Sequence, residues 1–242
     1  MQETIDKAYY FDRNEFLVLL WLSGAKGAYS FPLPTKETFD KRTFLQSIYA
    51  LTKRGFLVME DKPVLSSEIK RLMGQVCASK LVINIAPKDE FAQKICYLSD
   101  CKAAVLELSG QSGMFRFTEL PIEKFMYDLF EDVGLSRQPI VTEEEGVCME
   151  RYHECLSEER QHILALEERM PSPDFFAWAQ EIKAQSAWEF FLPEQNHWVR
   201  RLLFIEGCMN TWVLDKTEKI VKLHHDSQQL RDEIQKFIRE RL

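Results

Sequence analysis

A pattern of apolar residues that occurs twice constrains the fold of this chain more than any other feature. Residues 65–87 and 171–193 each begin with apolar positions spaced i, i+3 and i+7, and each ends in a strand-like apolar run. That spacing is typical of one buried face of a helix. Residues 95–117 and 202–223 follow at nearly the same offset, and each contains further short apolar runs separated by turn-forming residues. The repetition predicts one order of elements that is used twice.

We expect each copy to form a helix, a four-stranded antiparallel sheet and a closing amphipathic helix. Apolar stripes in residues 122–133 and 230–238 indicate the closing helices, the first of which is expected to stop at Gly134. A further helical segment is predicted ahead of each copy, within residues 35–55 and 143–169. Both copies therefore have the same plan from beginning to end.

The expected fold class is α+β with an internal pseudo-two-fold duplication and a winged-helix-like element in the first half. Residues 1–34 are predicted to form an N-terminal helix, from Asp12 to Ser23, and a loop. Residues 35–139 form the first α+β repeat and residues 140–242 the second. Because four short strands with two helices leave one face of a sheet uncovered, we expect the two repeats to pack as one composite domain.

The charge balance argues against nucleic acid as the main partner. The 242-residue chain has a net charge of −7, whereas nucleic-acid-binding domains normally show a basic excess. The acidic excess lies in residues 141–242, which hold 20 Asp+Glu and 13 Lys+Arg, since residues 1–140 hold 18 of each. Such an excess is typical of solvated helix faces, and it also suits a basic or polar partner.

Cysteine usage and hydropathy predict the compartment. The six cysteines form no CxxC pair, and most lie in apolar segments, as expected of free thiols in a reducing cytoplasm. The N-terminus lacks the basic region of a signal peptide. The longest apolar run, residues 16–22, is far shorter than the roughly 20 residues of a membrane span. We expect a soluble, cytoplasmic protein without membrane insertion.

No cluster of residues in the sequence indicates a catalytic or metal site. Cys148, His153 and Cys155 include two metal-ligand types, but on a helix His153 points away from Cys148, and structural zinc sites usually have two ligand pairs. Residues 109–113 (SGQSG) match neither a nucleophile elbow nor a phosphate-binding loop. We therefore expect no enzyme activity, no cofactor and no metal, and the sequence identifies no small-molecule ligand.

Residues 51–76 suggest an alternative function. Their pattern of helix, Lys-Arg-Gly turn, short strand, polar turn and helix resembles part of a winged helix. A DNA-binding winged helix presents basic and polar side chains to the major groove. The local cations here are interspersed with Glu60, Asp61 and Glu68. Because phosphate contacts dominate affinity for DNA, a structural role is favoured, and a DNA-binding transcription regulator is the alternative.

Aromatic side chains in the second copy are the candidate partner-binding residues. The segment 188–193 (WEFFLP) is apolar on both faces, with Trp188 on one and Phe191 on the other. Such a strand is either buried on both sides or partly covered by a partner. Trp198, expected in the following loop, is the aromatic residue most expected to be exposed. Because interfaces favour aromatic anchors, we predict that Trp188, Phe191 and Trp198 contact a partner, and burial in the core is the competing interpretation.

The order of elements resembles that of the EspG-type chaperones of type VII secretion systems. The resemblance covers about residues 35–242. It rests on the element order and on patterned positions, namely Leu51, Arg54, Gly55, Leu57, Leu65, Leu72, Val105 and Phe125. It implies a cytosolic protein with a quasi-two-fold α+β fold. It also implies a function, the binding of the hydrophobic tip of a helical export substrate by the sheet face and helices of the C-terminal half.

The sequence therefore predicts a non-enzymatic cytosolic protein-binding protein, a chaperone or adaptor for a helical client. The expected mechanism is burial of apolar surface between an aromatic-rich surface and a client helix, with the acidic excess at the rim. A catalytic function would require a pocket that gathers His153, His197 or His224 with a cysteine.

Overall fold

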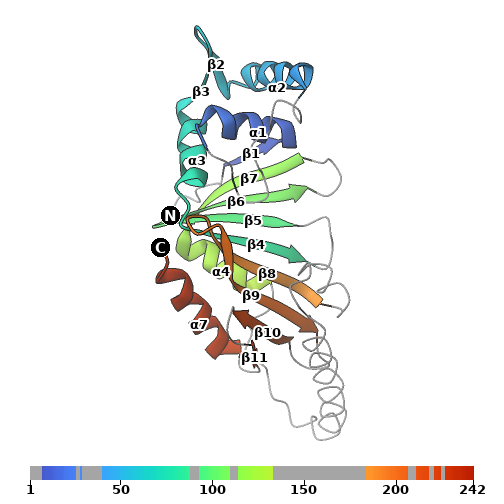
Figure 1. Cartoon of the computed structure of the whole chain (residues 1–242), viewed down its shortest axis with the longest axis vertical. Coiled ribbons are helices and arrows are strands. Elements are labelled where there is room, and N and C mark those ends of the chain that lie inside the picture. The colour runs from blue at the N-terminus through green and yellow to red at the C-terminus, as the bar shows by residue number, and fades with distance from the viewer. Residues whose placement is uncertain are drawn as a thin grey trace, which may run out of the picture.

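The computed structural model describes residues 7–25, 28, 40–87, 93–109, 114–132, 184–206, 211–217, 221–224 and 227–242. These residues form an α+β structure with five helices, one large sheet and a separate hairpin (Figure 1). The helices are α1 (Arg13–Leu22), α2 (Lys41–Lys53), α3 (Ser67–Cys77), α4 (Ile122–Asp132) and α7 (Ser227–Arg239). The strands of the large sheet are β1 (Ala8–Phe11), β4 (Leu81–Pro87), β5 (Lys94–Ser99), β6 (Lys102–Ser109), β7 (Met114–Pro121), β8 (Ala184–Leu192), β9 (His197–Glu206), β10 (Thr211–Thr217) and β11 (Val221–His224). The hairpin consists of β2 (Leu57–Met59) and β3 (Pro63–Leu65).

The large sheet has nine strands in the order β1-β7-β6-β5-β4-β8-β9-β10-β11, and all neighbours are antiparallel. β4 and β8 pair at its centre, where Ile83 lies opposite Phe190 and Ile85 opposite Trp188. On one side of this pair, β4 to β7 form a meander that α4 follows along the chain. On the other side, β8 to β11 form a meander that α7 follows. The predicted antiparallel strands are present, most of them a few residues longer than expected.

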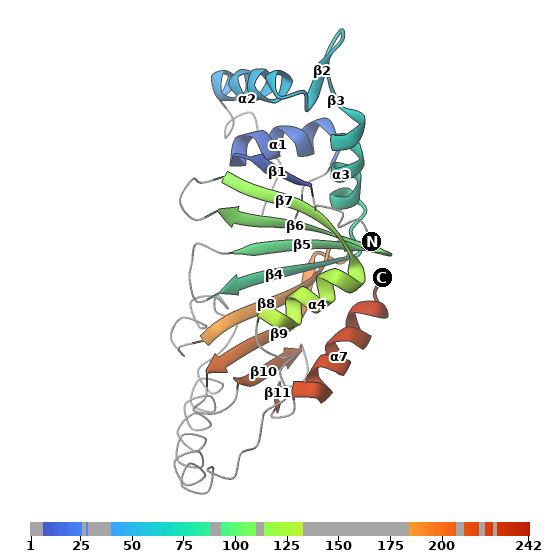
Figure 2. The ribbon, with the colours of Figure 1, turned by 180° about the vertical axis from the view of Figure 1, so that it is seen from behind.

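Helices α4 and α7 cover one face of this sheet and lie next to each other on it (Figure 2). Their apolar stripes pack on alternate residues of the central strands, so that this face forms one continuous core across both meanders. One ion pair is buried here: Arg200 of β9 donates hydrogen bonds to both carboxylate oxygens of Asp215 of β10, at 2.9 and 2.7 Å. The paired strands therefore carry a salt bridge inside a largely apolar layer.

Helices α1 and α3 pack on the opposite face, against β1 and β4 to β7, and α2 packs on α1. The start of α1 is fixed by a capping box, in which Asp12 accepts from the Glu15 amide and Glu15 accepts from the Asp12 amide. The predicted helix from Asp12 to Ser23 is thus confirmed, with those two residues as its caps. After α2, Gly55 adopts a φ of +74°, a conformation that favours glycine.

Strand β1 was not expected, since residues 1–34 were predicted to hold a helix and a loop. It pairs with β7 and forms an edge of the sheet. Arg54, which follows α2, reaches this edge: Nη1 donates to the Tyr10 carbonyl oxygen at 2.7 Å, and Nη2 lies 2.5 Å from Glu15. The guanidinium also stacks on the ring of Phe56, 4.9 Å from its centroid. One arginine therefore ties α1, α2 and the edge strand together.

Several predicted features lie outside the described residues. These are the helical segments within 143–169 and 171–183, the group of Cys148, His153 and Cys155, and the side chain of His224. None of the helices in the described part of the chain combines the length and the apolar character that a membrane span requires.

Candidate protein-binding surface

Of the three predicted partner-binding residues, Trp188 is a core residue. Its side chain has no exposed surface and packs among the residues of the α4–α7 face. Its ring lies 4.5 Å from the ring of Phe204 and 6.4 Å from that of Phe130, centroid to centroid. The alternation along β8 was read correctly, but the sequence did not show that the face carrying Trp188 is the one covered by two helices. In this structure Trp188 cannot touch a partner.

Phe191 and Trp198 lie on the opposite face of the sheet, and both are half-buried. They face each other across β8 and β9, next to an irregularity in the pairing of the two strands. Phe191 also lies opposite Val82 of β4 and packs against the core beneath α1 and α3. Trp198 was expected in a loop, but it is the second residue of β9, because the strand begins at His197 directly after a tight turn.

A chain of polar side chains holds Trp198 in place. The guanidinium of Arg201 lies 4.1 Å from the centroid of the Trp198 ring, a cation–π distance. Arg201 also forms an ion pair with Glu189, with 3.1 Å between Nε and Oε1. Asn84 donates to the other oxygen of Glu189 at 3.3 Å, and Gln93 donates to the Asn84 side-chain oxygen at 3.1 Å. We call Phe191, Trp198, Arg201, Glu189 and Asn84 the Trp198 cluster.

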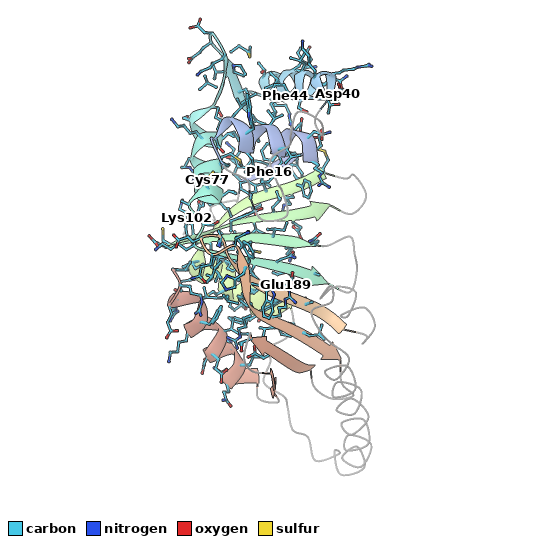
Figure 3. All side chains as sticks on the ribbon, in the orientation of Figure 1. Phe16, Asp40, Phe44, Cys77, Lys102 and Glu189 are labelled. Atoms are coloured by element: carbon cyan, nitrogen blue, oxygen red, sulfur yellow. The ribbon has the colours of Figure 1, made fainter. Side chains whose placement is uncertain are left out.

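The Trp198 cluster joins the two meanders at the centre of the sheet. Asn84 of β4 lies opposite Glu189 of β8, which in turn lies opposite Arg201 of β9, and directly opposed residues share a face. Glu189 is labelled at this junction in Figure 3. Glu189 and Asn84 are almost fully buried, so the ion pair sits in a site of low dielectric, where breaking it is costly. The cluster thus presents two partly exposed aromatic rings on a rigid polar base.

Sequence reasoning found the aromatic members of this cluster and missed its polar ones. The signal was present as Glu189 between aromatic neighbours in one strand and Arg201 in the next. A charged residue inside an apolar strand is unusual unless it is paired, so the two together indicate a cross-strand ion pair. Asn84 could be found in the same way, as the polar residue within the apolar run of β4.

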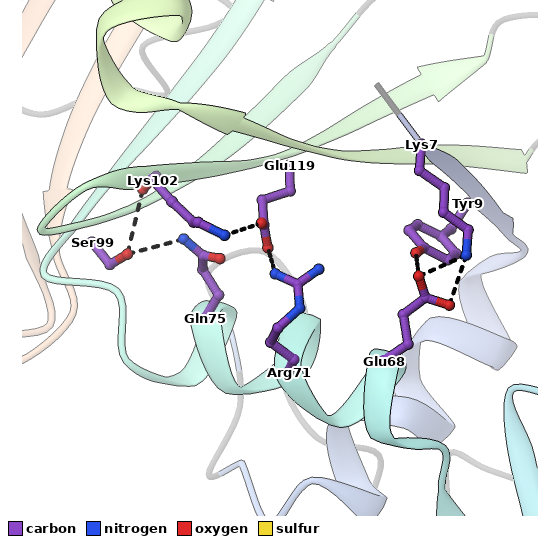
Figure 4. Close-up of polar contacts among 8 residues, drawn as sticks. All are labelled: Lys7, Tyr9, Glu68, Arg71, Gln75, Ser99, Lys102 and Glu119. Atoms are coloured by element: carbon purple, nitrogen blue, oxygen red, sulfur yellow. Dashed lines mark hydrogen bonds and ion pairs between the residues drawn. The ribbon is translucent and has the colours of Figure 1, made fainter. Parts of the chain in front are cut away.

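A second polar group fixes α3 to the sheet (Figure 4). Glu68 accepts hydrogen bonds from Lys7, at 2.6 and 2.8 Å, and from Tyr9. One turn further on, Arg71 contacts Glu119 of β7, which Lys102 also contacts. A last turn brings Gln75 to Ser99, with 3.0 Å between Nε2 and Oγ.

These contacts shift the acid–base behaviour of their members. The hydrogen bonds from Lys7 and then Tyr9 hold the pKa of Glu68 below its ordinary value. Burial acts to raise the pKa of Glu119, but hydrogen bonds from Lys102 and Arg71 outweigh it and leave that pKa lowered. Both carboxylates are therefore charged near neutral pH, and Lys7, Arg71 and Lys102 are paired with them.

The described residues give no candidate for a metal site. They contain no set of three or more His, Cys, Asp or Glu side chains that could hold a metal ion. A cavity of about 320 Å³ lies between the sheet and α4, and its described lining includes Cys96 but no histidine. Three of its charged lining residues pair with one another, Glu107 with Lys94 at 3.8 Å and with Arg116 at 3.4 Å, and the carboxylates of Asp128 and Glu131 also line it.

Comparison with known proteins gives no family assignment. No model of a protein family matches the chain, and no curated protein matches it. The function must therefore be argued from the Trp198 cluster and the fold around it.

Proposed function

We propose that this chain is a non-enzymatic protein-binding protein, a chaperone or adaptor that holds a helical client such as a secretion substrate. The observation that carries the proposal is the pair of half-buried rings of Phe191 and Trp198, which face each other across two strands. The Trp198 ring packs on Arg201, which is itself held by an ion pair with Glu189. Tryptophan and arginine are the residues most enriched among the energetic anchors of interfaces. Here both occur in one cluster.

The rigidity of the cluster favours binding. A side chain that is already fixed loses little conformational freedom when a partner covers it, so more of the contact energy appears as affinity. Trp198 is held by its strand, by the guanidinium of Arg201 and by the neighbouring Phe191. Truncating such an anchor costs about 2 kcal/mol or more of binding free energy, which is roughly a thirtyfold loss of affinity. A client helix would place apolar residues against the two rings.

The same proposal includes the duplicated architecture. Residues 35–139 and 140–242 would be two related α+β repeats in one composite domain, with a winged-helix-like arrangement of α2, β2, β3 and α3 in the first. The support is the matching order of β4–β7 with α4 and of β8–β11 with α7, on the two sides of the central strand pair. This is the plan expected from the resemblance to EspG-type chaperones, which are cytosolic, and we propose a cytoplasmic location on the same ground.

The charges around α3 favour a protein client over DNA. Arg71, Lys7 and Lys102 are all engaged by carboxylates, and the apolar side of α3 is buried against the sheet. The remaining cation of α3, the exposed Lys70, has no ion-pair partner among the described residues. One unpaired cation supplies few of the phosphate contacts that give DNA-binding domains most of their affinity. The transcription-regulator alternative therefore receives no support from α3.

An affinity capture from the native cytosol tests the proposal. The wild-type chain should retain a small helical protein in stoichiometric amount, and the double variant Phe191→Ala/Trp198→Ala should lose it. Tyr127→Ala is the matched control, because Tyr127 is an aromatic residue with 57% exposure on α4, away from the cluster. It should capture the client as the wild type does.

The folded state of each variant must be checked by circular dichroism and thermal unfolding before the captures are compared. Equal capture by the wild type and by the folded double variant would contradict the proposal. Co-purified DNA that is released by salt would also contradict it and would favour the transcription-regulator alternative.

A further inference from the structure

Helix α2 presents a face that no described residue covers. Two of the most exposed large apolar residues of the described chain, Leu45 at 54% and Tyr49 at 71%, lie one turn apart on it. The other exposed residues of the helix are Lys41, Arg42, Gln46 and Lys53. At 100° per residue, all six project within a sector of about 140°, so they form one continuous surface. We call these six residues the α2 face.

The charges of the α2 face have one sign. Residues 41–53 contain two lysines and one arginine and no acidic residue, in a chain with a net charge of −7. Within the described part of the chain, Lys41, Arg42 and Lys53 have no ion-pair partner. Asp40, the acidic residue directly before the helix, is occupied as N-cap, since its carboxylate accepts from the amides of Arg42 and Thr43. The cations thus remain available to an external partner.

We infer that the α2 face is a second docking surface, whose occupant is an acidic amphipathic helix of another protein. The apolar centre at Leu45 and Tyr49 fits the apolar stripe of such a helix, and the flanking cations fit carboxylates on both sides of that stripe. An open hollow of about 600 Å³ lies against the face, and its described lining is Asp40, Lys41, Arg42, Leu45, Gln46 and Tyr49. The inference does not depend on the proposed function, because the α2 face and the Trp198 cluster are separate surfaces, on α2 and on the sheet between β4 and β9.

Two other occupants fit less well. A second copy of the chain would place one α2 face on another, and both parallel and antiparallel packing would bring cations against cations. Nucleic acid would suit the cations but would leave the Leu45–Tyr49 centre without an apolar partner. It would also meet Glu60 and Asp61, which are exposed at the tip of the β2–β3 hairpin that directly follows α2.

Fluorescence anisotropy with a defined probe tests the inference. The probe is a labelled peptide of about 18 residues, long enough to form a helix, with leucines at i, i+3, i+4 and i+7 and glutamates at the flanking positions. Its counterpart carries lysines in place of the glutamates. The full chain should bind the acidic peptide at least tenfold more tightly than the basic one, and raising the salt concentration should weaken this binding.

Variants locate the site. Tyr49→Ala and the double variant Lys41→Glu/Lys53→Glu should each weaken binding of the acidic peptide at least fivefold. These residues are exposed, so the variants are expected to fold. Tyr127→Ala on α4 and Phe191→Ala/Trp198→Ala in the Trp198 cluster should leave it unchanged. Equal binding of the two peptides, or no effect of the α2 variants, would overturn the inference. So would tighter binding of an 18-base-pair DNA duplex that the α2 variants abolish.

Discussion

The substitution Asp215→Ala would isolate the buried ion pair between β9 and β10. Arg200 and Asp215 have side chains that are only 6% exposed, and they share two hydrogen bonds of 2.9 and 2.7 Å. Without Asp215, the guanidinium keeps the Glu233 carboxylate at 3.9 Å and the Phe237 ring, whose centroid is 5.1 Å away. Neither contact replaces a bidentate pair of charge-assisted hydrogen bonds.

The expected loss of unfolding free energy is about 3 kcal/mol, the low end of the 3–5 kcal/mol for breaking a buried pair, because Glu233 remains within reach. The double variant Arg200→Met/Asp215→Leu removes both charges and keeps most of the volume. It is expected to lie within about 1 kcal/mol of the wild type, since apolar replacements of buried pairs are often neutral. The double variant should therefore be more stable than the single one.

Equilibrium unfolding in urea measures both values. Tryptophan fluorescence and far-ultraviolet circular dichroism should give coincident transitions if unfolding is two-state. A loss of less than about 1 kcal/mol for Asp215→Ala would mean that water or a rearranged neighbour solvates Arg200, and the reasoning would fail. A double variant as unstable as Asp215→Ala would show that the cost comes from lost packing rather than from an unpaired charge.

Two further predictions concern the first meander and its helices. The pKa of Glu119 is lowered in the folded state, so the charged carboxylate stabilises the fold above its ordinary pKa of 4.5, and this stabilisation is lost as pH falls through the folded value. Glu119→Gln should therefore be less stable than the wild type at pH 7, and its free energy of unfolding should fall less on acidification. Urea unfolding across the acid range measures both effects. Gly55→Ala should cost about 1 kcal/mol, because φ is +74° while no atom lies within 4 Å of the added Cβ. Gly74→Ala, in α3 and equally open, should instead stabilise by about 0.5–1 kcal/mol. Equal signs for the two glycines in thermal unfolding would contradict the backbone argument.

The sequence predicted the elements whose signal is local. Asp12 and Glu15 specify the start of α1, and the apolar stripes specify α4 and α7, because capping and amphipathicity depend on residues a few positions apart. The antiparallel strands of both meanders were found for the same reason, since turns and alternation are short-range. Strand β1 has only four residues, and it is a strand because it pairs with β7, more than 100 positions away in the chain. No local pattern could show that.

The candidate site was predictable only in part, because alternation along a strand is local, whereas helix packing and strand register are not. Alternation placed Trp188 and Phe191 on opposite faces, but which face α4 and α7 would cover depends on tertiary packing. The position of Trp198 depends on the turn at 193–196, where Asn196 has a φ of 53° and allows β9 to begin early. The Arg201–Glu189–Asn84 chain needs the registers of two strand pairs at once. Single-sequence reasoning identifies the residue types but not these registers.

The contact between Arg54 and the Tyr10 carbonyl also affects how copies of this protein meet one another. An open sheet can grow into a fibre only if each copy accepts a strand at one edge and offers one at the other. At the β1 edge, one carbonyl is already occupied and α1 lies alongside, as Figure 1 shows. Stacking of copies edge to edge through β1 would first have to displace this arginine. Replacing Arg54 would therefore free the β1 edge for pairing with another copy, in addition to removing a stabilising contact.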